Sequence, residues 1–166
     1  MDLYIVRHAV AAERDPLAWP DDADRPLTSD GIARFRRAAR GLRRIVPEVE
    51  AVLSSPYVRA WDTAQILADE AGWPAPTRCD ALAADRPPAA AVKALAQRPS
   101  LAAVALVGHE PHLGELATLL LVGGAPRPVL ELKKGAVVCL QLEGKPRPGS
   151  AVLRWVLPPK VLRLLA

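Results

Sequence analysis

Arginine and histidine stand at positions where they could act together on a phosphoryl group. Arg7 and His8 are neighbours near the start of the chain, and Arg59 and His109 follow much later. The guanidinium of an arginine is a planar fork of donors that matches phosphate oxygens. An imidazole can attack phosphorus in line and form a phosphohistidine, which water then hydrolyses. Nearby positive charges lower the pKa of such an imidazole and keep it neutral enough to attack.

Each of these residues comes soon after a segment that is typical of a buried strand. Asp2–Val6, Ala51–Ser54 and Leu101–Val107 are short and apolar, and each leads directly into polar residues. Ser55-Pro56 suits the cap and first position of a helix, which places Arg59 in its first turn, where orphan N–H groups attract an anion. Ligands of open parallel sheets bind beyond the carboxyl ends of the strands. The sequence therefore predicts that these groups converge at that edge.

The rest of the chain alternates between helical and extended patterns. Helices are expected after the cap Thr28 as far as Val46, from Ser55 to Ala71, over Pro88–Gln97, from Pro111 to Gly123 and from Pro159 onward. Extended segments are expected at Thr77–Cys79, Ala136–Leu142 and Ala151–Leu157. This alternation predicts an α/β fold in one domain, residues 1–166. The predicted architecture is a three-layer α/β/α sandwich with a mostly parallel sheet and an antiparallel C-terminal strand pair.

Four motifs in this order resemble those of the histidine phosphatase superfamily, the phosphoglycerate mutase-like group. They are Leu3 to Ala9, Arg25-Pro26-Leu27-Thr28 with Gly31, Ser54-Ser55-Pro56 with Arg59 and Thr63-Ala64, and Val107 to Pro111. The short chain and Ala9 in place of glycine make it most similar to the compact phosphohistidine phosphatases of the SixA type. The resemblance implies a phosphatase with His8 as its nucleophile. It implies a phosphate pocket formed by Arg7, Arg59, His109 and Ser55.

The chain has no obvious match for the general acid that larger relatives carry after the third strand. Five acids are candidates on the sequence alone: Glu13, Asp15, Asp80, Asp85 and Glu110. The imidazole that leaves a phosphohistidine is far less basic than an alkoxide and needs less help from an acid. This favours phosphohistidine in a protein as the substrate. The alternatives are a phosphatase for small phosphoesters and a non-catalytic phosphate-binding adaptor.

A metal-dependent mechanism is the next alternative. His8, His109 and His112 could mimic a three-histidine zinc site, but the two arginines of the pocket would repel the cation. The acids Asp21, Asp22 and Asp24 lie in a polar, proline-rich loop over residues 10–27 and are expected to face water. We therefore predict no metal and no cofactor. His112 could touch the pocket or face water.

A run of arginines between Arg34 and Arg44 suggests nucleic-acid binding at first sight. On a helical wheel most of them fall opposite Phe35, Ala38, Ala39 and Leu42, so a solvated face is the interpretation we favour. The same face could dock an acidic partner. We expect the partner to be a phosphorylated protein or a small phosphorylated substrate, and neither nucleic acid nor a membrane.

The composition sets outer limits on these interpretations. The 166 residues are 51% hydrophobic and 24% charged with a net charge of +4, which excludes a disordered tail, a coiled coil and a disulfide scaffold. No apolar run has the length of a membrane span, and the first residues lack the basic segment of a signal peptide. The two cysteines, Cys79 and Cys139, suit a reducing compartment. A cytoplasmic location is expected.

Overall fold

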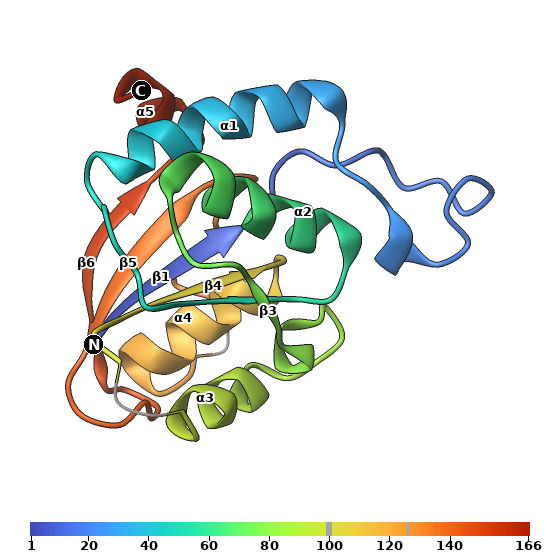
Figure 1. Cartoon of the computed structure of the whole chain (residues 1–166). Coiled ribbons are helices and arrows are strands. Elements are labelled where there is room, and N and C mark those ends of the chain that lie inside the picture. The colour runs from blue at the N-terminus through green and yellow to red at the C-terminus, as the bar shows by residue number, and fades with distance from the viewer. Residues whose placement is uncertain (99–100, 126) are drawn as a thin grey trace.

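One mixed sheet forms the centre of the computed structural model, which describes residues 1–98, 101–125 and 127–166. Within these residues the strand order is β3-β2-β4-β1-β5-β6 (Figure 1). The strands are β1 (Asp2–Arg7), β2 (Ala51–Ser54), β3 (Thr77–Arg78), β4 (Ala103–Gly108), β5 (Val137–Leu142) and β6 (Ala151–Leu157). Strands β1 to β4 are parallel, and β5 runs antiparallel to both β1 and β6. The predicted sheet is confirmed, including its C-terminal strand pair.

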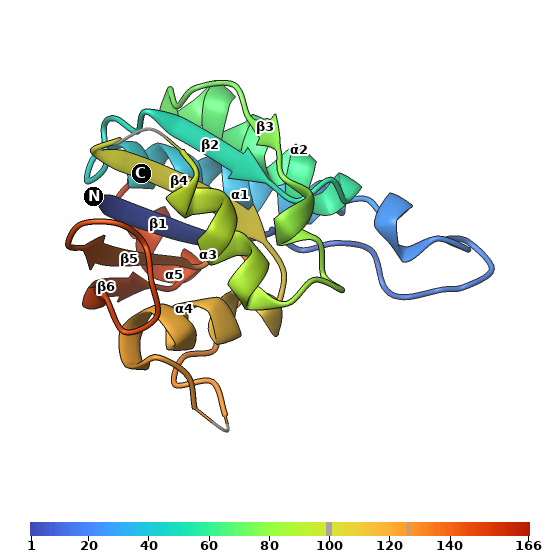
Figure 2. The same ribbon diagram turned by 90° about the horizontal axis from the view of Figure 1, so that it is seen from below.

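Helices cover both faces of the sheet, as Figure 2 shows from below. The helices α1, α2 and α5 lie on one face, and α3 and α4 lie on the other. Their bounds are α1 (Ser29–Arg43), α2 (Val58–Ile66), α3 (Pro88–Ala96), α4 (His112–Val122) and α5 (Pro159–Leu164), with short turns η1 (Asp22–Asp24), η2 (Leu67–Ala71) and η3 (Asp80–Leu82). The predicted three-layer α/β/α sandwich is therefore correct. None of these described helices is long and apolar enough to cross a bilayer.

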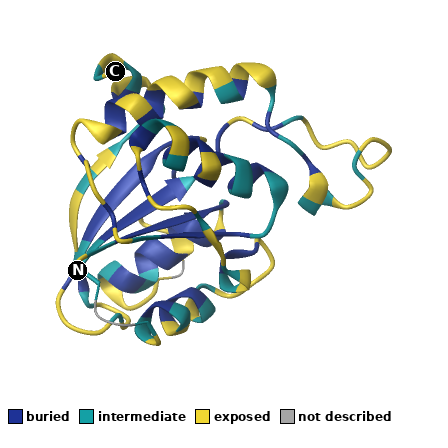
Figure 3. Cartoon of the chain, viewed as in Figure 1, coloured by how far each residue is buried: buried dark blue, intermediate teal, exposed yellow. Residues whose placement is uncertain are grey.

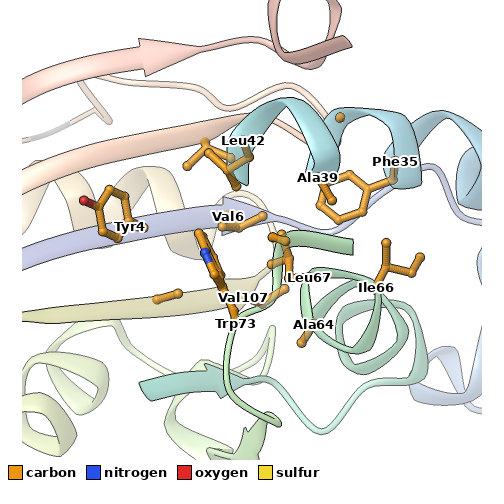
Figure 4. Close-up of a cluster of buried hydrophobic side chains, with 14 of the residues drawn as sticks. Tyr4, Val6, Phe35, Ala39, Leu42, Ala64, Ile66, Leu67, Trp73 and Val107 are labelled. Atoms are coloured by element: carbon orange, nitrogen blue, oxygen red, sulfur yellow. The ribbon is translucent and has the colours of Figure 1, made fainter. Parts of the chain in front are cut away.

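The core is split by the sheet into two layers. Tyr4 and Val6 of β1 face α1 and α2, in the cluster drawn in Figure 4. Leu3 and Ile5 face α3 and α4. Because β1 is buried on both faces, its sequence is continuously apolar instead of alternating. Figure 3 shows the central strands as buried and the outer faces of the helices as exposed.

Two helix boundaries were predicted with different success. Thr28 caps α1 as expected, because its hydroxyl accepts the Gly31 N–H at 2.9 Å. Helix α2 begins at Val58, with Tyr57 at the cap position, so the expected start at Ser55-Pro56 is wrong. Arg59 is nevertheless in the first turn of α2, as the sequence predicted.

The segment between β1 and α1 extends away from the sheet, beyond the carboxyl end of β1 (Figure 1). A single bridge between Ala11 and Leu27 closes the base of this loop. The turn η1 lies within it and brings Asp22 back toward α2, where it reaches Arg59. The loop is thus anchored at its base and at η1.

Candidate active site

A polar pocket of about 380 Å³ opens at the carboxyl edge of the parallel strands. Arg7 ends β1 and His8 follows it, Arg59 comes from the first turn of α2, and His109 follows β4. The four residues that sequence reasoning singled out thus line one pocket. The full lining is Arg7, His8, Ala11, Ala12, Glu13, Arg14, Arg25, Arg59, Ala84, His109, Glu110 and Lys134.

His8 is held in the form that a nucleophile requires. Its side chain is 5% exposed, and its Nδ1 lies 2.7 Å from the Ala9 carbonyl oxygen. A carbonyl only accepts hydrogen bonds, so Nδ1 carries the proton and Nε2 keeps its lone pair. Burial is the largest cause that lowers the pKa of His8 to about 3, and the charges of Arg59 and Arg7 act in the same direction. The sequence pointed to nearby charges alone as the cause of a lowered His8 pKa, whereas burial is the larger cause.

His109 lies beside His8, with 5.2 Å between the ring centroids. Its Nε2 is 2.8 Å from the Ser55 hydroxyl, and Tyr57 packs against its ring at 5.0 Å between centroids. Burial, and then the proximity of His8, lower the pKa of His109 to about 2. Ser55 is completely buried behind His109. Its position therefore suits support of His109 better than the direct phosphate contact expected from the sequence.

Arg59 is 3% exposed and is held by the loop that follows β1. It donates to the Asp22 carbonyl oxygen at 2.6 Å and to Asp22 Oδ2 at 2.8 Å. The other carboxylate oxygen of Asp22 accepts from Arg25 Nε at 2.9 Å. Asp21 and Asp24 are exposed as expected, whereas Asp22 is only half-exposed and pairs with Arg59 and Arg25, which the sequence did not predict. Burial tends to raise the pKa of Asp22, but hydrogen bonds and charges from Arg25 and Arg59 outweigh it and lower that pKa.

Three further cations, Arg14, Arg25 and Lys134, line the pocket and were not proposed as site residues from the sequence. Arg25 is 7% exposed and donates to the Ala12 carbonyl oxygen at 2.7 Å. Lys134 lies far from His8 along the chain, just before β5, and its charge lowers the pKa of His8. Arg25 belongs to the second of the four motifs, and this position could have identified it as a site residue. Lys134 belongs to none of the four motifs. Only the pairing of β5 with β1 shows that it lies near the pocket.

The structure separates the five candidate general acids. Glu13 and Glu110 line the pocket. Asp15 instead accepts the N–H groups of Leu17 and Ala18 at a turn of the loop, while Asp80 begins η3 and Asp85 is exposed. Burial raises the pKa of Glu110, whose Oε1 accepts the Leu132 N–H at 3.0 Å. Glu110 is thus a pocket carboxyl whose protonated form is favoured by burial.

His112 is 2% exposed at the first position of α4, so it does not face water. Burial lowers its pKa. It lies outside the set of residues that line the pocket. Among the described residues, no three His, Cys, Asp or Glu side chains are grouped in a way that could hold a metal ion.

The arginine run of α1 is a solvated face, as favoured from the sequence. The five arginines of α1 and Arg44 at its C-cap are all exposed. Arg34 pairs with Asp30 at 2.8 Å and Arg40 pairs with Glu70 at 2.9 Å. Exposed pairs of this kind contribute little to stability.

The fold and the site together define a class of protein. A sequence model of the histidine phosphatase superfamily (branch 1) matches residues 3–83, and the whole chain resembles a solved phosphatase of this kind in its fold. A solved structure of the protein histidine phosphatase SixA in complex with tungstate has a TM-score of 0.83 and 26% identity, with 98% of this chain and 99% of that chain covered.

This chain is also similar to two other phosphatases. The phosphohistidine phosphatase SixA of Escherichia coli K12 is 38% identical over 69 residues, which are 42% of this chain and 40% of that protein. The chain therefore spans about 40% of the length of the curated relatives that it matches. A mycobacterial glucosyl-3-phosphoglycerate phosphatase with inorganic phosphate shares the fold at a TM-score of 0.72 and 16% identity, covering 96% of this chain and 98% of that chain.

The buried imidazoles predict that acid destabilises the protein. Above the ordinary pKa of 6.5, His8 and His109 are neutral both folded and unfolded and add nothing to pH dependence. Below 6.5 the unfolded chain binds protons that the folded chain cannot, so stability falls with falling pH. We expect the protonation of each of these imidazoles in the unfolded chain to lower the free energy of unfolding by about 2 kcal/mol between pH 7 and pH 5.

Urea unfolding followed at several pH values checks this expectation. Asp22 does not contribute in that window, because its pKa is lowered from an ordinary value of 3.8 and its stabilising effect is lost only in stronger acid. His109→Gln removes one of the three buried imidazoles, His8, His109 and His112, and should make the pH dependence less steep. An unfolding free energy that stays constant from pH 7 to pH 5 would contradict the assignment of neutral, buried imidazoles.

Proposed function

We propose that this protein is a phosphatase that works through a phosphorylated His8 and that its substrate is phosphohistidine in a cytoplasmic protein. The observation that carries the proposal is the buried, neutral His8 with a free Nε2 in a pocket lined by Arg7, Arg59 and His109. A nucleophile with its proton on the far nitrogen and cations around it fits in-line attack on a phosphoryl group.

The reaction has two steps. In the first, Nε2 of His8 forms a bond to phosphorus while the bond from phosphorus to the substrate nitrogen breaks, and the leaving imidazole takes up a proton. Arg7, Arg59 and His109 stabilise the negative charge on the three equatorial oxygens. In the second, a water oxygen forms a bond to phosphorus, the bond to Nε2 breaks and inorganic phosphate leaves. Glu110 is well placed to supply and recover the proton.

Two observations support phosphohistidine as the substrate. The relative from Escherichia coli is named a phosphohistidine phosphatase, and its matched segment is 38% identical. Glu13 is an exposed carboxylate, and the Leu132 N–H on Glu110 Oε1 works against the effect of burial on the Glu110 pKa, so Glu110 suits a weakly basic leaving group better than an alkoxide. An imidazole leaving group places a smaller demand on them. The small-phosphoester alternative rests on the fold shared with the mycobacterial phosphatase.

The test compares substrates on the purified chain. A phosphohistidine peptide should be hydrolysed with a higher kcat/KM than simple sugar phosphates. A reactive phosphoryl donor should leave phosphate on His8 after a rapid quench, which mass spectrometry locates. Preference for a sugar phosphate would replace the substrate assignment, and the absence of both turnover and trapped phosphate would favour the non-catalytic adaptor.

Chelation tests the metal-free mechanism. The pocket already holds Arg7, Arg25, Arg59 and Lys134, so it supplies positive charge to the phosphoryl group and repels a divalent cation. Activity is therefore expected to persist in EDTA. Vanadate, which adopts a five-coordinate geometry like that of the transferring group, should compete with the substrate. Loss of turnover on chelation that zinc or magnesium restores would overturn this mechanism.

A further inference from the structure

A second cavity of about 260 Å³ lies next to the candidate active site, and we call it the basic side pocket. Lys134 lines both cavities, and Ala9, the residue after His8, lines the second. The floor is formed by glycine, proline and Phe35, and the charged rim consists of Arg34, Lys133, Lys134 and Arg163. The two cavities are thus adjacent and share a cation.

The rim of the basic side pocket carries uncompensated positive charge. Its four charged lining residues are all basic. Asp30 neutralises Arg34 in part, at 2.8 Å. Among the described residues, no carboxylate lies within ion-pair distance of Lys133, Lys134 or Arg163. The rim therefore attracts an anionic group.

Backbone contacts fix this pocket relative to the nucleophile. The Gly135 N–H lies 3.1 Å from the carbonyl oxygens of both Arg7 and His8. The Ala136 N–H donates to the Lys133 carbonyl oxygen at 2.8 Å and closes the lysine turn. A group bound at this turn is therefore held at a fixed position relative to a phosphoryl group on His8.

We propose that the basic side pocket binds an aspartate or glutamate side chain of the phosphoprotein substrate, next to its phosphohistidine. The inference rests on the proposed function. The charge of the rim selects an anion, and the apolar floor with Phe35 and Pro159 accommodates the methylene groups that carry a carboxylate. Because the two cavities adjoin, one continuous peptide segment can fill both. The pocket would then set substrate preference without touching the reacting atoms.

Two peptides and one double variant test the proposal. Both peptides carry phosphohistidine; one has glutamates on either side of it and the other has glutamines at the same positions. Lys133→Ala/Arg163→Ala removes two rim charges outside the candidate active site. It is expected to raise KM for the glutamate peptide by about threefold to tenfold, because exposed ion pairs contribute modestly. Its kcat, and its KM for the glutamine peptide, should not change. High salt should abolish the difference between the peptides.

Matched variants separate the site from overall charge and from folding. Lys133→Arg/Arg163→Lys keeps the charges and should keep the low KM. Arg44→Ala/Lys93→Ala removes two exposed charges elsewhere and should behave as the wild type. Equal KM values for the two peptides in the wild type, or an equal rise for both in the rim variant, would overturn the proposal. If the wild type hydrolyses neither peptide, the proposed function itself fails.

Discussion

His8→Ala is expected to lower turnover by about 10⁴-fold or more, because removal of a covalent nucleophile abolishes the main reaction path. The arginines of the pocket stay in place in this variant. Vanadate should therefore still bind, though more weakly than to the wild type. Steady-state turnover of a phosphohistidine peptide and vanadate titration of the same preparation measure the two effects.

The control for His8→Ala is a second substitution in the same pocket. Glu13→Gln changes an exposed side chain that lines the pocket and should leave phosphate trapping on His8 intact. The His8→Ala protein should trap no phosphate at all, while its unfolding transition remains cooperative. Turnover near the wild-type level in a folded His8→Ala variant would show that the covalent mechanism is wrong.

Arg59→Ala is expected to cost about 3 to 4 kcal/mol of transition-state stabilisation, by analogy with the loss of one preorganised oxyanion donor. Arg59→Lys should restore only part of it. The guanidinium places one nitrogen on the Asp22 carbonyl oxygen and another on Oδ2, and it spreads its charge over a plane. An ammonium is a point charge that cannot hold both contacts and also face a phosphoryl group.

The kcat/KM values of the two Arg59 variants measure this effect, and Arg7→Ala should give a loss of similar size. Arg36→Ala provides the matched control, since Arg36 is exposed on α1, and its kcat/KM should equal that of the wild type. Full activity in Arg59→Lys would contradict the bidentate geometry.

The fold and the principal site residues were predictable because their signals are local. A buried strand followed by Arg7-His8 can be read from eight adjacent residues, and the parallel arrangement then places such strand ends together. The contacts of Asp22 and Ser55 were not predictable in the same way. Asp22 reaches Arg59 across 37 residues, and Ser55 reaches His109 across 54, so the contacts that build the site join residues far apart in the sequence. The spacing of residues along the sequence does not predict such long-range contacts.

The central position of β1 has a consequence for when the pocket exists during synthesis. Strand β1 lies between β4 and β5, and the turn before β5 supplies the Gly135 N–H and the Leu132 carbonyl oxygen that contact His8 and Arg7. Both of these groups leave the ribosome more than 120 residues after the nucleophile does. A nascent chain that already contains the four motifs up to Pro111 therefore lacks the turn before β5, and one side of its pocket is still open to solvent. Such a chain carries the reactive residues without a completed site, and acquires that site only when β5 docks.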